Sequence, residues 1–108
     1  MYDLGLLGRA IGALALVAGA LMVPPVIPPN PLFGARLPQA FRSRADWNRI
    51  NRYAGVTFVL AGVTDLVLGQ WARSWDASSS FLRGVASLLP VVPILVAARL
   101  TRRFAERT

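Results

Sequence analysis

Three long runs of apolar residues divide the chain, and charged residues are concentrated between them. The runs are Leu4 to Val23, Tyr53 to Trp71 and Phe81 to Leu100, and charges interrupt the first two at Arg9 and Asp65. Each approaches the roughly 20 residues that a helix needs to cross about 30 Å of hydrocarbon. Because an open sheet cannot satisfy its hydrogen bonds in lipid, the pattern predicts an all-α integral membrane bundle of three helices.

The first run could also be a signal peptide, since the small residues Ala18 to Ala20 resemble a cleavage site. Asp3 stands where a signal peptide carries bases, and the apolar run continues beyond the small residues. We therefore expect a retained span. It should end near Val23, because Pro24 and Pro25 cannot continue a helix.

The second helix should begin before its apolar run. Ser43, followed three residues later by Asp46, is typical of a capping box and would make Arg44 the first helical residue. No helix breaker follows until Trp71, so we expect one long helix whose first turns lie in the cytoplasmic interface. The predicted cytoplasmic loop is then the segment 24–52, which includes the first turns of this helix.

The third helix should follow a short outer loop at residues 72–80. Asp76 or Ser78 would cap it. Pro90 and Pro93 fall in the middle of this run, where membrane helices tolerate proline, usually with a kink. The basic segment 101–108 should continue the helix past the membrane as a cytoplasmic tail.

Composition supports a membrane protein and supplies an orientation. The 108 residues, read here as a single domain, are 55% hydrophobic and carry a net charge of +7, with arginine as the only basic residue type. Nine arginines lie in the first loop and the tail, against three elsewhere, and the positive-inside rule therefore predicts an outer N-terminus and a cytoplasmic C-terminus in a bacterial inner membrane. The nine are Arg36, Arg42, Arg44, Arg49, Arg52, Arg99, Arg102, Arg103 and Arg107.

The residue types that are missing restrict the chemistry. Without cysteine or histidine, disulfides, thiol chemistry, transition-metal sites and histidine catalysis are not expected. No catalytic motif and no phosphate-binding loop stands in the sequence, so we expect no enzyme, no catalytic residues and no cofactor. The arginines accompany no aromatic stacking platform, which indicates anionic lipid headgroups as partners and not nucleic acid.

Charges within the spans are the sharpest chemical signal. An unpaired charge there costs roughly 2.5–3.5 kcal/mol, and pairing reduces that cost. We therefore predict an ion pair between Asp65 and Arg9, with Arg83 as the second candidate partner. Two interpretations stay open: the pair fixes the order of the helices, or Asp65 belongs to a proton or ion relay or a polar pocket.

Small residues recur at regular spacing on two spans. Glycines repeat every seven residues on the second span, and a similar series marks the first. Faces of small residues let membrane helices approach closely. The series serves either packing within one bundle or the seam of a homodimer, so a homo-oligomer is possible. The candidate packing residues are Gly8, Gly12, Gly55, Gly62 and Gly69, with Gly5 and Gly19 completing the series on the first span.

One ordered pattern is spread over "PPNPLFGARLPQAFRSRADWNRINRYAG", residues 28–55. After a proline-rich span end come Asn, a G-x-R element, a charged stretch, a Trp, an Asn four residues later and a Gly opening the next span. This segment resembles the signature of the SdpI family of small bacterial membrane proteins, although Leu37 stands where that pattern has Thr or Ser. The matching positions are Asn30, Gly34, Arg36, Trp47, Asn51 and Gly55.

The resemblance implies an integral membrane protein whose cytoplasmic signature loop takes part in toxin immunity or in signalling by recruiting a regulator. We expect a protein partner: a toxin, a regulator or a larger membrane complex. The alternatives are an accessory subunit that stabilises a larger complex, and a minimal transporter that uses Asp65. Arg36 either folds back onto the region of Asn51, with Trp47 stacked at the interface, or grips a lipid phosphate or a partner protein together with Asn51.

Overall fold

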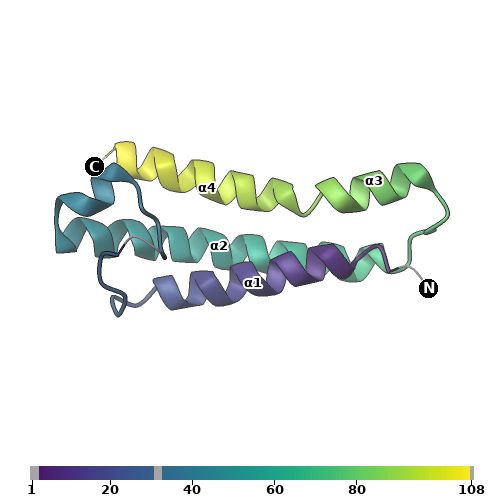
Figure 1. Cartoon of the computed structure of the whole chain (residues 1–108), viewed down its shortest axis with the longest axis horizontal. Coiled ribbons are helices and arrows are strands. Elements are labelled where there is room, and N and C mark those ends of the chain that lie inside the picture. Colours follow the sequence, from purple (N-terminus) through teal and green to yellow (C-terminus); the bar gives the residue numbers. More distant parts are fainter. Residues whose placement is uncertain (1–2, 31–32, 108) are drawn as a thin grey trace.

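The computed structural model describes residues 3–30 and 33–107, and over that part of the chain it is all-helical. α1 and α2 lie side by side and antiparallel, while α3 and α4 follow one another along a third line (Figure 1). The molecule is elongated, 51 × 23 × 20 Å, and its two termini lie at opposite ends. The elements are α1 Leu6–Met22, the 3-10 helix η1 Pro38–Arg42, α2 Arg44–Ala72, α3 Ser80–Leu88 and α4 Val91–Glu106.

The long second helix begins where its sequence predicted. The Ser43 hydroxyl accepts a hydrogen bond from the Asp46 amide at 3.0 Å, and Arg44 is the first helical residue. The Asp46 carboxylate pairs with Arg49 at 2.7 Å. At 29 residues α2 is about 44 Å long, more than a hydrocarbon core of about 30 Å, so its ends extend beyond such a core.

The predicted cap of the third helix is wrong. Asp76 accepts hydrogen bonds from the amide and the hydroxyl of Ser78, so both residues close a turn of their own. Ser79 is the N-cap, and its hydroxyl accepts from the Leu82 amide at 3.2 Å. The next serine along is therefore free to cap, and α3 begins at Ser80.

Of the two prolines in the third apolar run, only Pro90 interrupts the helix. α3 ends at Leu88 and α4 begins at Val91, with Pro90 between them lacking the amide that would continue the ladder. Pro93 lies in the first turn of α4, where an amide has no partner within the helix in any case. α4 continues to Glu106, so the basic tail is helical up to that residue.

Glycines form the contact between α1 and α2. Three pairs of glycines face each other where the two antiparallel helices meet, and successive glycines are seven residues apart on each side. At every pair an added Cβ would meet backbone of the other helix closer than side chains normally allow. The seam is therefore occupied within one chain. The pairs are Gly5 with Gly69, Gly12 with Gly62, and Gly19 with Gly55, and Gly8 lies beside Gly69 and Pro90.

Large apolar side chains along the helices point outward, not inward. Leu14, Leu60 and Leu95 are 72%, 62% and 62% exposed, whereas the residues buried between the helices are mostly glycine and alanine. Water would not tolerate so much contiguous apolar surface on a small monomer, but lipid does. Two stretches, Arg44–Ala72 and Ser80–Glu106, are long and apolar enough to cross a membrane, and α1 is a shorter apolar helix.

A compact core of larger side chains lies at one end only. Trp47 and Ile50 of α2 are buried there against Ala40 of η1 and Ala105 of α4. This is the end at which the described parts of the α1–α2 loop, residues 23–30 and 33–43, fold over the start of α2 (Figure 1). Here the packing resembles the core of a soluble domain, which sets this end apart from the glycine seam.

Candidate functional site

Trp47 anchors the first part of the α1–α2 loop. It lies in the first turns of α2, and its side chain is 1% exposed. The indole nitrogen donates a hydrogen bond to the carbonyl of Ile27 at 2.8 Å, and the ring packs against Phe41 of η1 at a centroid distance of 5.3 Å. A buried indole usually finds such a partner, and here the partner is loop backbone.

Asn51 anchors the later part of the same loop. It lies one turn beyond Trp47, so both side chains leave α2 on the same face. Its Oδ1 accepts a hydrogen bond from the amide of Ala35 at 2.7 Å, and its Nδ2 donates to the Trp47 carbonyl at 3.0 Å. Together the two side chains hold the loop at Ile27 and at Ala35, and we call this pair the loop clamp.

Gly34 is required next to the clamp for two independent reasons. Its φ is +104°, which side chains with a Cβ rarely adopt. An added Cβ would also lie 2.5 Å from Asn51 Oδ1 and 3.1 Å from Trp47 Cζ2. Glycine therefore lets the backbone reach the clamp with the amide of Ala35 in place.

The outer signature positions also have structural roles. Asn30 donates to the Pro28 carbonyl at 2.8 Å and accepts from the Phe33 amide at 2.7 Å, which closes a local turn. Gly55 lies one turn beyond Asn51, where an added Cβ would be 2.6 Å from the carbonyl oxygen of Gly19. Trp47, Asn51 and Gly55 thus form one stripe that positions first the loop and then the end of α1.

Arg36 comes directly after Ala35, the loop residue that Asn51 holds. Its side chain is exposed and contributes to the lining of a groove between α1 and α4. The donor to Asn51 Oδ1 that the sequence pattern missed is the backbone amide one residue earlier, at Ala35. A residue pattern cannot specify a backbone donor. Whether Arg36 itself folds back or grips a ligand stays a prediction. Leu37, at the hydroxyl position of the family pattern, also lines the groove.

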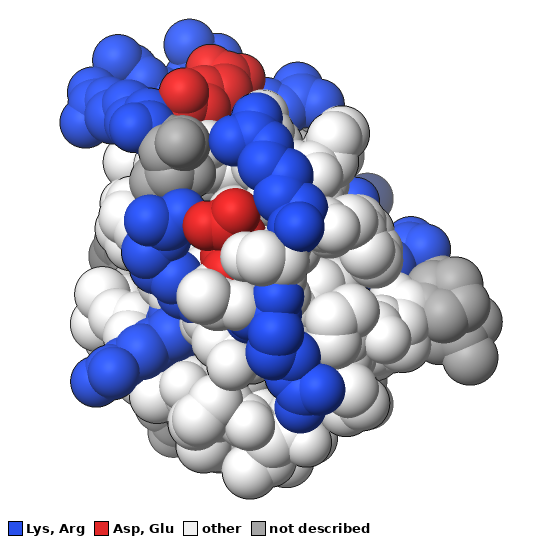
Figure 2. Space-filling model, turned by 90° about the vertical axis from the view of Figure 1, so that its left-hand side faces the viewer, with Lys and Arg blue, Asp and Glu red and all other residues white. Residues whose placement is uncertain are grey.

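The end that carries the clamp is strongly basic. Figure 2 looks onto this end and shows arginines spread around it, with smaller, separate acidic areas among them. The α1–α2 loop, the first turns of α2 and the last turns of α4 all meet here. We call this surface the cationic end, and its arginines are Arg36, Arg42, Arg44, Arg49, Arg52, Arg99, Arg102, Arg103 and Arg107.

The predicted ion pair of Asp65 is wrong. Arg9 pairs with Asp3, six residues earlier, and Arg83 donates to the Ala77 carbonyl at 3.1 Å. Asp65 is fully buried, and its carboxylate has no hydrogen-bond partner among the described residues. Its Cβ lies against Gly12, in the glycine seam. Arg9 reaches toward the end of the bundle instead, as long basic side chains in membranes tend to do.

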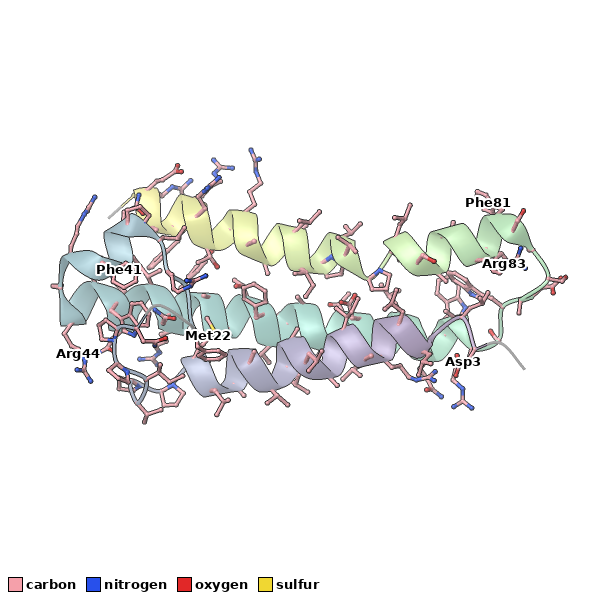
Figure 3. The ribbon with its side chains drawn as sticks, in the orientation of Figure 1. Asp3, Met22, Phe41, Arg44, Phe81 and Arg83 are labelled. Carbon is pink, nitrogen blue, oxygen red and sulfur yellow. The ribbon has the colours of Figure 1, made fainter. Side chains whose placement is uncertain are left out.

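Asp3 organises the opposite end of the molecule (Figure 3). Its carboxylate accepts from the Gly5 amide at 2.8 Å and lies 3.9 Å from Arg73. The hydrogen bond from Arg9, helped by the Gly5 amide, lowers the pKa of Asp3 below its usual value. An acid six residues before the arginine that interrupts the first apolar run is the signal for this pair in the sequence.

The side chains at the cationic end are suited to binding. Within residues 3–30 and 33–107 no three His, Cys, Asp or Glu side chains are grouped to hold a metal ion. The clamp's own polar groups are used on backbone, the Trp47 indole and Asn51 Oδ1 on the loop and Asn51 Nδ2 on α2. The cationic end presents outward mainly guanidinium groups, with smaller acidic areas and the ring of Phe41, which is 50% exposed.

Comparison with known proteins agrees with the resemblance noted in the sequence. Residues 26–101 match the family model of the SdpI/YfhL protein family, a segment that includes the whole clamp, α2 and α3 and most of α4. The comparisons with curated proteins and with solved structures give no match. Because the matched segment covers most of the chain, the protein belongs to the SdpI/YfhL family.

Proposed function

We propose that the chain is a non-enzymatic protein of the bacterial inner membrane that acts by binding a protein partner at its cationic end. The N-terminus lies outside and the cationic end lies in the cytoplasm. The observation that carries this proposal is the loop clamp, which fixes a basic surface that carries an exposed aromatic ring at the end of a lipid-facing bundle.

The orientation rests on charge. Nine of the twelve arginines belong to the cationic end, and the other three are Arg9, Arg73 and Arg83. The two groups lie at opposite ends of a molecule 51 Å long. Basic residues next to spans favour the cytoplasmic side, which supports a cytoplasmic cationic end.

The chemistry of the surface favours a protein with an acidic face. Arginine and aromatic residues are enriched at the energetic centres of interfaces. Phe41 rests on the buried Trp47, so its exposed ring is presented with little freedom to lose on binding. Complementary charge speeds the encounter and selects the partner.

Family membership supports a role in toxin immunity or membrane signalling. A basic cytoplasmic surface suits the signalling role best, because a regulator approaches from the cytoplasm. The alternative, an accessory subunit of a larger membrane complex, would use the apolar flanks of the helices instead.

Purification from native membranes in mild detergent tests the binding proposal. We expect co-purification of a partner to be lost with Arg42→Glu combined with Arg44→Glu. It should persist in the matched control, Arg73→Glu combined with Arg83→Glu, whose exposed arginines lie at the other end of the molecule, where α2 ends and α3 begins. A stoichiometric large complex that survives both pairs of changes would instead favour the accessory subunit.

The orientation has its own test, since the chain contains no cysteine. In intact cells a maleimide that cannot cross membranes should label Ser78→Cys, in the loop before α3, and leave Ala45→Cys unlabelled until the cells are opened. Labelling in the reverse pattern would overturn the orientation without bearing on the fold.

A further inference from the structure

A groove of about 420 Å³ runs between α1 and α4 beside the α1–α2 loop. Its lining is mainly apolar. The Thr101 hydroxyl in this lining is already bonded to the Ala97 carbonyl and lies 3.3 Å from the Thr57 hydroxyl. Its size is within the range of ligand sites, about 300–1,000 Å³. Residues from three helices and the loop line it, among them Ala18, Met22, Phe58, Ala98, Thr101 and Arg36.

The groove is polar at one end and apolar along its length. Phe58 and Ala98 belong to the apolar runs of α2 and α4. Arg36 belongs to the loop, at the level of the cationic end. An occupant therefore has a hydrocarbon tail along the helices and an anionic group near the loop.

We propose that this groove binds one acyl chain of an anionic phospholipid, whose phosphate meets Arg36. The planar guanidinium fork matches phosphate oxygens and forms charge-assisted hydrogen bonds with them. Arg102 follows Ala98 by one turn, so it lies on the same side of α4 and adds positive charge near the opening. The lipid comes from the leaflet in contact with the cationic end.

The site goes beyond partner binding, but the two share structural elements. Gly34 and Ala35 both line the groove and meet the loop clamp at Asn51. A bound lipid therefore packs against the backbone that the clamp holds, and it stabilises the fold of the cationic end. Binding of the lipid needs no protein partner, so the two proposals fail independently.

Native mass spectrometry of the purified protein in a neutral detergent tests the site with two probes, phosphatidylglycerol and phosphatidylcholine of identical chains. We expect one phosphatidylglycerol to bind about fivefold more tightly than phosphatidylcholine, a factor that corresponds to one arginine near a lipid surface. Arg36→Gln should remove this preference. The matched control Arg52→Gln, an exposed arginine of the same end that does not line the groove, should keep it.

A second variant tests the apolar part. Ala98 is exposed on α4, so Ala98→Phe fills the groove without disturbing the buried core. We expect binding of both lipids to weaken about tenfold, with the helical circular dichroism spectrum unchanged. Equal binding of the two lipids to the unchanged protein, or equal losses in Arg36→Gln and Arg52→Gln, would overturn the proposal. So would a dimer whose groove is covered by a second copy and which lipid does not displace.

Discussion

Gly12 of α1 and Gly62 of α2 face each other so closely that a Cβ on either would lie within 2.7 Å of the other's carbonyl oxygen. The distances are 2.7 Å from Gly12 and 2.6 Å from Gly62. Glycine at both positions brings the two backbones together, and van der Waals contact across the seam replaces the hydrophobic effect that lipid cannot supply.

Gly62→Ala should therefore destabilise the protein. The added methyl has no room, because backbone atoms of α1 surround it, and overpacking of this kind costs about 1–3 kcal/mol. Unfolding in a detergent titration measures the change. The matched control is Gly84→Ala in α3, where no atom lies within 4 Å of the added Cβ and stability should rise by about 0.5–1 kcal/mol. Equal effects of the two changes would contradict the seam.

Asn51→Ala should release the later part of the loop. The Ala35 amide loses its acceptor, which costs about 1–3 kcal/mol if that group stays buried. Hydrogen exchange at Ala35 should become faster while that of the α2 interior stays slow. Asn48→Ala is the control on the same helix, because the Oδ1 of Asn48 has no hydrogen-bond partner among the described residues. Unchanged exchange at Ala35 in Asn51→Ala would argue against the clamp.

Sequence reasoning located the elements because their signals are local. Two of these signals depend on residues that are close in the sequence: the Ser43 cap and the prolines that end α1. The third is the seven-residue spacing of the glycines, which places them on one face of a helix. The clamp residues were found by their spacing, but their partners were not. Those partners are the amide of Ala35 and the carbonyl of Ile27, backbone groups that every residue carries.

The prediction of an ion pair between Arg9 and Asp65 failed for a different reason. Arg9 and Asp65 were matched by their depth in the spans, but depth alone does not decide which way a long side chain turns. Asp3 is the acid that Arg9 meets. The groove between α1 and α4 was not predicted either, because it depends on how the loop folds across three helices.

Asp65→Asn should leave the fold intact. The carboxylate is buried without a hydrogen-bond partner among the described residues, so no bond is lost when the amide replaces it. Burying a group that can carry charge is costly in a membrane span, and we expect thermal stability at neutral pH to stay equal or to rise by up to about 2 kcal/mol. A clear loss of stability would reveal a partner that the buried side chain needs. Loss of a proton-coupled flux in this variant would support the transporter alternative.

Acid should weaken the opposite end through Asp3. Because Arg9 lowers the pKa of this carboxyl in the folded protein, its stabilising contribution is complete above the unfolded-state value of about 3.9 and is lost as the pH falls through the lowered one. The melting-temperature difference between the unchanged protein and Asp3→Asn should be constant between about pH 5 and 7 and disappear once the pH has fallen below the lowered pKa of Asp3. A difference that persists in strong acid would contradict this pairing.

Photocrosslinking in living cells tests the central claim, partner binding at the cationic end, most directly. A photoreactive phenylalanine analogue replaces Phe41 or, as the matched control, Phe81, which is 76% exposed at the other end (Figure 3). We predict one defined crosslinked protein from position 41, absent when Arg42→Glu and Arg44→Glu are added, and none from position 81. A crosslink from position 81 alone, or one from position 41 that ignores the arginine changes, would contradict the account.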